Sequence, residues 1–344
     1  MLSKWERPKL FYLKAECNRT ECLNLRTALS LPMKYILLLF LILAAEGKAQ
    51  RTNPRVFIST DIGGADPDDY QSMVHLLLYA NDLDLEGLVS SPPDKGRKEH
   101  ILEVIDAYEK DFPKLSKQGN YPTAEYLRAI TKQGLTDSQK NPMPDSTLSE
   151  GAKWLIEKAR KQDERPLYVL VWGSATDLAQ ALYFAPDMKR KIRVYYIGSW
   201  NTVQDTLARN YIYEQHPDLW FIENNTTFRG MYMGGFQEGD YGNVTFVEKH
   251  IKDHGALGQL FYEKKKSIKM GDTPSVLYLL HGEPDQPETD SWGGSFQKTS
   301  HGPHYFTDKS DPAYQENDKA GAKTVNRWRK AYLDDWRIRM EWIK

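Results

Sequence analysis

The chain is poor in cysteine. It has two cysteines in 344 residues, Cys17 and Cys22, and none follows them. The rest of the chain therefore has neither a disulfide framework nor a thiolate metal site. An exported form would depend on its hydrophobic core, and on any metal that it binds, for stability.

An excess of positive charge is also missing. The chain has 46 Lys and Arg against 47 Asp and Glu, a formal net charge of −1 at pH 7. Proteins that bind nucleic acid usually present a basic surface to the phosphates. The C-terminal stretch "RWRKAYLDDWRIRMEW" at residues 327–342 contains its own acids and predicts a closing amphipathic helix. We expect no nucleic-acid partner.

The apolar run near the start is too short to cross a membrane. Its core, residues 35–45, falls short of the roughly 20 residues that a membrane-spanning helix needs. Residues 33–49 have the parts of a secretory signal peptide: one lysine, this core, and small residues ending at Ala49. Residues 1–32 then indicate a start codon assigned too early. A cytoplasmic tail on a signal anchor is the alternative.

These features predict where the protein works. No cysteine follows the apolar core, which argues against a lipoprotein anchor. We expect a secreted or periplasmic protein without a stable membrane anchor, whose folded domain spans residues 50–344. A homo-oligomer is left open.

The remaining chain alternates strand-like and helix-like segments. Apolar, β-branched runs predict strands at residues 55–60, 84–91, 166–173 and 191–198, and helical patterns lie between them at 70–80, 97–112, 146–162 and 175–185. The polar segment 116–145 predicts an irregular surface excursion. This alternation predicts a single-domain α/β fold with a mainly parallel sheet and helices on both faces. Ligands of such sheets bind beyond the carboxyl ends of the strands.

One loop at that edge is unusually acidic. "TDIGGADPDD", residues 60–69, places four aspartates in a strand-to-helix turn. Asp66 as N-cap, with Pro67 opening the helix, and a first turn containing Asp68 and Asp69 would explain part of this charge as helix capping. Capping does not explain Asp61, at the end of the strand. Carboxylates held together repel one another unless a cation lies between them, so the loop also predicts a metal site.

A further aspartate opens an apolar helix near the C-terminus. In "GDTPSVLYLL", Asp272 directly precedes the predicted helix. Alone, it is best explained as an N-cap residue. Together with the acidic loop, it becomes a candidate metal ligand.

These segments resemble a known family. A strand that ends in aspartate, a DD pair that opens a helix, "WGSATDLAQAL", and an Asp-led helix occur in the same order as the DxDPGxDD, GPLTNxA and HDPxA motifs of nucleoside hydrolases. "GDTPSVLYLLHGEPDQPETDSWGG" and "NRWRKAYLDDWRIRMEW" are more similar to an exported bacterial branch of that superfamily, often labelled cellulose-binding. The resemblance runs from about Arg55 to Trp342.

The resemblance implies a role for particular residues. It implies calcium ligation by Asp61, Asp69, Asp272 and the main-chain carbonyl of Thr176, and substrate contacts from Asp68, Asp94 and Asn210. Trp292 could stack on a sugar or a base, although buried packing explains it equally well. In the implied mechanism, water on the calcium ion loses a proton to Asp61 and attacks the anomeric carbon of a sugar.

The chain departs from the family where the leaving group is protonated. Nucleoside hydrolases have a histidine immediately before the last metal-binding aspartate, and this chain has Gly271. A glutamate that contacts ribose in the family is replaced by Ala208. The candidate replacements for the histidine are His254, His281, His301 and His304.

Three functions follow from this pattern. The first is a calcium-dependent hydrolase of N- or O-glycosidic bonds in small nucleoside-like or sugar substrates. The second is a carbohydrate-binding or cellulose-binding protein without turnover. The third is a structural calcium module. The loops contain more polar side chains than binding an ion alone requires, which argues against this third function.

Overall fold

The computed structural model describes residues 52–64, 66–91, 96–136 and 147–344. Residues Asn53–Lys344 form one compact unit. The predicted signal segment 33–49 and the predicted extension 1–32 lie outside the described residues. None of the described helices is long and apolar enough to cross a membrane.

The described residues form an eight-stranded sheet in the order β3-β2-β1-β4-β5-β6-β8-β7. All neighbouring strands run parallel except the pair β7 and β8. The strands are β1 (Arg55–Thr60), β2 (Asp84–Ser90), β3 (Thr131–Gln133), β4 (Leu167–Val171), β5 (Ile192–Ile197), β6 (Phe221–Asn224), β7 (Phe296–Lys298) and β8 (Tyr305–Asp308). The predicted α/β class with a mainly parallel sheet is confirmed.

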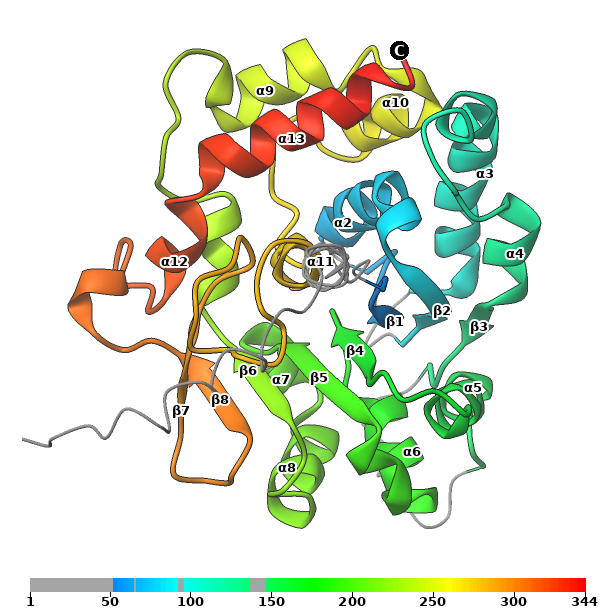
Figure 1. The fold of residues 1–344 in the computed structure, drawn as a ribbon, viewed down its shortest axis with the longest axis vertical. Coiled ribbons are helices and arrows are strands. Elements are labelled where there is room, and N and C mark those ends of the chain that lie inside the picture. The colour runs from blue at the N-terminus through cyan, green and yellow to red at the C-terminus, as the bar shows by residue number, and fades with distance from the viewer. Residues whose placement is uncertain (1–51, 65, 92–95, 137–146) are drawn as a thin grey trace, which may run out of the picture. The chain divides into compact units, whose positions relative to one another are not determined.

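Helices cover both faces of this sheet (Figure 1). They are α2 (Asp68–Leu78), α3 (Lys98–Leu115), α4 (Ala124–Ala129), α5 (Glu150–Arg160), α6 (Thr176–Phe184), α7 (Trp200–Gln204), α8 (Thr206–Gln215), α9 (Asn243–His250), α10 (Gly255–Lys264), α11 (Thr273–Leu280), α12 (Ala322–Asn326) and α13 (Arg329–Glu341). The predicted closing helix is α13. Short 3₁₀ turns, among them η3 (Thr227–Met231), complete the connections.

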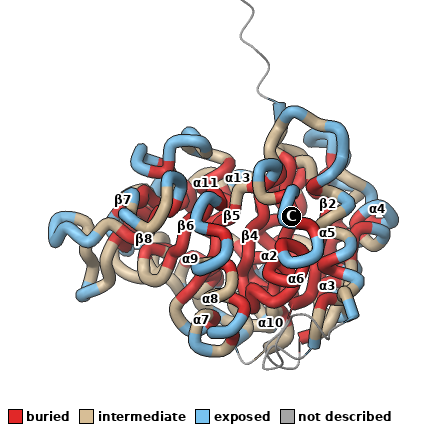
Figure 2. The backbone as a smooth tube through the Cα atoms, turned by 90° about the horizontal axis from the view of Figure 1, so that it is seen from below, coloured by how far each residue is buried: buried red, intermediate tan, exposed pale blue. Residues whose placement is uncertain are grey.

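The alternation of side chains along the central strand divides the core in two. Val56 and Ile58 of β1 pack into one apolar cluster, together with residues of α2, α3, α10 and α13. Phe57, between them, packs into a second cluster with residues of α5, α6 and α8. Successive residues of a strand point to opposite faces, so a fully apolar strand must be buried on both. Figure 2 shows buried residues concentrated along β4, β5 and the helices beside them.

Two local predictions were wrong. The segment 116–145 is not wholly irregular, because it contains the short helix α4 and the edge strand β3, which pairs with β2. Asp66 does not cap α2: the helix begins at Asp68 without a side-chain cap, and Asp66 forms an ion pair with Lys269 instead. A charged partner distant in the sequence displaced a local capping interaction.

Candidate functional site

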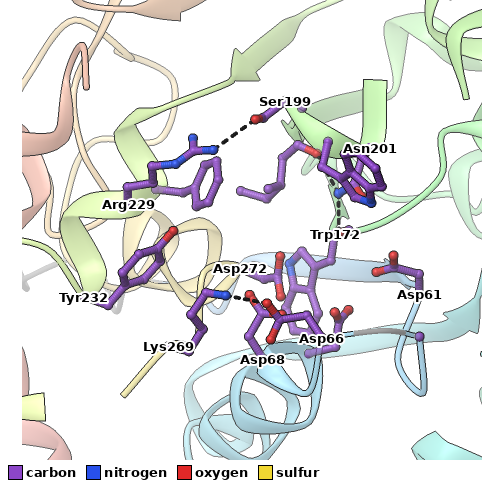
Figure 3. Close-up of a pocket in the computed structure, with 16 residues that line it drawn as sticks. Asp61, Asp66, Asp68, Trp172, Ser199, Asn201, Arg229, Tyr232, Lys269 and Asp272 are labelled. Carbon is purple, nitrogen blue, oxygen red and sulfur yellow. Dashed lines mark hydrogen bonds and ion pairs between the residues drawn. The ribbon is translucent and has the colours of Figure 1, made fainter. Parts of the chain in front are cut away.

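A cavity of about 450 Å³ opens at the carboxyl ends of the central strands. Figure 3 shows the side chains that line it. They are Asp61, Gly64, Asp66, Asp68, Asp69, Trp172, Ile197, Gly198, Ser199, Trp200, Asn201, Phe228, Arg229, Tyr232, Lys269 and Asp272. Four predicted site residues, Asp61, Asp68, Asp69 and Asp272, therefore share one cavity.

The four aspartates come from three elements. Asp61 follows β1, Asp68 and Asp69 open α2, and Asp272 immediately precedes α11. The end of β4 lies directly against Asp61: a Cβ atom on Gly173 would stand 2.7 Å from the Cβ of Asp61. Glycine at this position therefore lets two parallel strands end side by side with a carboxylate between them.

Burial and mutual repulsion raise the pKa of all four carboxyl groups. Burial, followed by the charge of Asp68, raises the pKa of Asp61 to about 7. Burial and the charge of Asp66 raise the pKa of Asp68 to about 6. The pKa values of Asp69 and Asp272 rise well above the usual value, first through burial and then through neighbouring aspartates. Without a bound cation, the ionised state of all four carboxyl groups is therefore unfavourable. A cation among them would favour the ionised state.

Asp272 occupies the N-cap position of α11 without capping it. Its side chain accepts no hydrogen bond from the first turn of the helix, and its buried Oδ2 has no hydrogen-bond partner among the residues that the structure describes. The residue is 4 % exposed. A buried carboxylate oxygen without a partner is costly, so a capping role does not account for this aspartate.

The donor atoms at this site suit a hard cation. Asp69 accepts a hydrogen bond from the Thr60 hydroxyl through one oxygen, and Asp272 has a free oxygen. Carboxylate oxygens are the ligands that calcium prefers. In the described part of the chain, no group of three or more Asp, Glu, His or Cys side chains is arranged as a metal cage. The chemistry of the donors fits calcium, and the side chains would have to close around it.

Two cations line the same cavity, and no sequence motif pointed to either of them. Lys269 forms an ion pair with Asp66. Arg229, from η3, donates to the carbonyl of Asn225 and to the hydroxyl of Ser199. Neither residue belongs to a recognisable motif. Both lie in connections between elements, and only the folded chain brings these connections to the cavity.

The position of the missing histidine is closed by packing. A Cβ atom on Gly271 would lie 3.1 Å from a carboxylate oxygen of Asp68 and 3.2 Å from the ring of Phe228. Those contacts are tight for a Cβ atom alone, and an imidazole would extend beyond it. Phe228 therefore lies next to the place where the family presents its leaving-group acid.

The other predicted residues are not among those that line this cavity, or they lie outside the described residues. Thr176 is buried at the start of α6, where its hydroxyl donates to Asp205 at 2.5 Å. Asn210 lies on α8, where it accepts a hydrogen bond from Arg209. Trp292 stacks on His281 with ring centroids 3.5 Å apart. Asp94 lies outside the described residues. The roles of these four residues stay predictions.

The candidate histidines have other partners. His254 contacts Glu341 at 3.0 Å, and His301 contacts the carbonyl of Tyr213 at 2.8 Å. His281 stacks on Trp292, and His304 is exposed. None of these four histidines lines the cavity.

The fold and the position of the cavity define a nucleoside hydrolase-like α/β protein. The family model described as "Cellulose-binding Sde182, nucleoside hydrolase-like domain" matches residues 55–296. The chain belongs to this family.

Solved structures agree with this assignment. A nucleoside hydrolase-related protein from Saccharophagus degradans, associated with carbohydrate metabolism, is 26% identical, with 85% of this chain and 72% of that chain covered at a TM-score of 0.68. The type III effector protein XopQ, solved with adenosine diphosphate ribose, is 14% identical, with 91% and 99% covered at a TM-score of 0.50, a likeness of fold alone. No match was found among curated proteins.

Proposed function

We propose that this protein is a calcium-dependent hydrolase of N- or O-glycosidic bonds in small sugar or nucleoside-like substrates. The observation that carries the proposal is the cavity in which Asp61, Asp68, Asp69 and Asp272 converge from three elements. The unpartnered oxygen of Asp272 and the raised pKa values of these carboxyl groups support a cation among them.

The aspartates of the cavity have different roles in the proposed reaction. Asp61, Asp69 and Asp272 would hold calcium, which supplies a Lewis acid that fixes sugar hydroxyls and neutralises the carboxylates. Asp61 accepts a proton from the attacking water, and Asp68 accepts a hydrogen bond from a sugar hydroxyl. The carboxylates also favour the positive charge that develops on the sugar ring in an oxocarbenium-like transition state.

The alternative function is carbohydrate binding without turnover. Two observations favour it: the family is described as cellulose-binding, and Phe228 packs beside Gly271 where a leaving-group acid would stand. A binding protein could retain the fold and the ion while lacking this proton donor.

A hydrolysis screen decides between the two functions. The protein, from residue 50 onward, is incubated with nucleosides and small glycosides, first with calcium and then with chelator. A hydrolase releases sugar only with calcium, and turnover that survives chelation contradicts the proposed mechanism. Binding to sugars or cellulose without turnover supports the alternative.

We also propose export through the segment 33–49. If Met33 is the true start, signal peptidase should cut near Ala49 and leave Gln50 or Arg51 at the N-terminus. Mass spectrometry of the protein recovered outside the cytoplasm tests this. An exported protein that keeps residues 1–50 intact would contradict it.

A further inference from the structure

The wall of the cavity contains a guanidinium group that has no acidic partner among the described residues. Arg229 lines the cavity together with the aspartates. Among the described residues, no carboxylate lies within ion-pair distance of it, and its two side-chain hydrogen bonds go to uncharged acceptors. Lys269, the other cation of the cavity, is already paired with Asp66. Arg229 thus has further N–H donors for a ligand, and no described carboxylate offsets its charge.

Several contacts hold this guanidinium in place. One nitrogen donates to the Asn225 carbonyl at 2.7 Å, and another donates to the Ser199 hydroxyl at 3.1 Å. The guanidinium carbon lies 4.5 Å from the ring centroid of Phe228. An arginine oriented in this way loses little conformational entropy when it binds a ligand.

The backbone at Ser199 is strained in a way that serves this arrangement. Ser199 has φ 58° and ψ −111°, a conformation that is rare for a residue other than glycine. Its N–H donates to the side chain of Asn225 at 2.9 Å, which fixes the loop between β5 and α7. In this backbone conformation the serine hydroxyl accepts the hydrogen bond from Arg229 at the wall of the cavity.

The cavity is therefore divided by charge. Figure 3 shows Arg229 pointing toward Ser199, away from the cluster of Asp66, Asp68 and Asp272. Burial raises the pKa of Tyr232, the charges of Arg229 and Lys269 lower it, and those of Asp68 and Asp66 raise it, so this side chain lies near both groups. A neutral sugar could satisfy the carboxylates through its hydroxyls, but it would leave the charge of Arg229 unmatched.

We propose that the ligand of this cavity is a sugar that carries one anionic group, a carboxylate or a phosphate ester, bound by Arg229 and Ser199 while its hydroxyls face the aspartates. This inference rests on the proposed function, since it names the substrate class of the same site. A planar guanidinium can bind either anion through two parallel hydrogen bonds.

Binding measurements with matched sugars test the inference. Isothermal titration calorimetry, with calcium present and at fixed ionic strength, measures the affinity of the wild-type protein for three groups of sugars. The carboxylates are glucuronate and galacturonate, the phosphate esters are glucose 6-phosphate and ribose 5-phosphate, and the neutral counterparts are glucose, galactose and ribose. We expect at least one anionic sugar to bind about tenfold more tightly than its neutral counterpart. The two anionic arms show whether carboxylate or phosphate is recognised.

Three variants locate the effect. Arg229→Gln should remove the preference for the anionic sugar, and Arg229→Lys should keep part of it because the charge remains but the two parallel hydrogen bonds are lost. Arg193→Gln is the matched control, because Arg193 does not line the cavity and pairs with Asp285 at 3.5 Å. It should leave every affinity unchanged.

The results separate this inference from the proposed function. Equal affinity for anionic and neutral sugars, no binding of any anionic sugar, or an unchanged preference in Arg229→Gln would overturn the anionic substrate class. Calcium-dependent melting and hydrolysis of neutral glycosides could persist in each case, which would leave the hydrolase proposal standing. If calcium does not raise the melting temperature of the wild-type protein and no glycoside is hydrolysed, the proposed calcium-dependent hydrolase itself is contradicted.

Discussion

Four of the aspartates that line the cavity, Asp61, Asp68, Asp69 and Asp272, carry an electrostatic cost in the protein alone. Burial removes water from the carboxylates, and their closeness adds repulsion, so their pKa values rise. Natural proteins accept such costs mainly where a ligand or a reaction repays them. Asp272 shows this most clearly, because its buried Oδ2 has no hydrogen-bond partner within the described part of the chain.

Substitution of single aspartates distinguishes metal ligands from helix caps. As a cap, Asp272→Asn should change the free energy of unfolding by less than about 1 kcal/mol, because Asn caps as well as Asp. As a calcium ligand, it should lose most of the stabilisation that calcium gives, which is about 2.7 kcal/mol at a hundredfold excess over Kd. Asp61→Asn should behave alike. Thermal melting with calcium and with chelator measures both effects.

Asp68→Asn is the control within the same cavity. We place Asp68 on the substrate, so this variant should keep more of the calcium response than the other two. Equal calcium shifts in wild type, Asp61→Asn and Asp272→Asn would mean that these aspartates do not bind the ion.

Among the helices, the start of α5 ties two elements together. Ser149 is its N-cap: the hydroxyl accepts a hydrogen bond from the N–H of Ala152 at 2.9 Å and donates to Asp177 of α6. Asp177 is 2 % exposed and also accepts from Ser91 at 2.5 Å. The cap therefore supports a buried carboxylate as well as a helix end.

This double role predicts unequal costs for two capping substitutions. Thr123 caps α4 through a single bond, from the N–H of Tyr126 at 3.1 Å. Thr123→Ala should cost about 1 kcal/mol. Ser149→Ala should cost about 2 kcal/mol or more, because it also leaves Asp177 short of a donor. Urea unfolding measures both, and equal losses would show that Asp177 does not depend on Ser149.

At the scale of the whole molecule, the larger of the two apolar clusters surrounds a buried histidine. His75 of α2 is 1 % exposed, stacks on Tyr79 with ring centroids 4.5 Å apart, and meets the edge of Trp336 of α13. Its Nδ1 has no hydrogen-bond partner. Burial, with a smaller contribution from the charge of Arg339, lowers the pKa of His75 to about 3.

This shift predicts acid sensitivity of the folded state. Between pH 6.5 and about 3 the unfolded chain binds a proton at His75 and the native state does not. The contribution of His75 to stability is therefore complete above pH 6.5 and decreases as the pH falls, by up to about 1.4 kcal/mol per pH unit. Urea unfolding of wild type and His75→Gln at pH 7, 6 and 5 should show the stability difference between them narrowing or reversing.

His304→Gln is the matched control, because His304 is exposed. Its stability relative to wild type should stay constant over the same pH range. A constant difference for His75→Gln as well would show that His75 takes up its proton in the native state. Comparing differences cancels the opposite pH dependence that the cavity aspartates contribute in chelator.

Local sequence patterns were sufficient for much of this architecture. The β-branched run that became β1 and the helical pattern of α2 predicted the central strand-to-helix turn, and the alternation of elements predicted the parallel sheet. Sequence order also predicted that Asp61 would stand at the carboxyl edge of the sheet with Asp68 and Asp69, because the strand ends at Asp61 and the helix after the turn opens with the other two.

Only the tertiary structure decided what completes the cavity. Arg229, Phe228 and Lys269 carry no local signal, since each lies in a connection whose path is fixed by packing distant in the sequence. The antiparallel end of the sheet at β7 and the pairing of Asp66 with Lys269 have the same origin. Burial, and with it the pKa of every cavity carboxyl group, depends on what the whole chain packs around a residue. A sequence pattern identifies the charged residues, and the fold determines which of them are buried and which of them lie in contact.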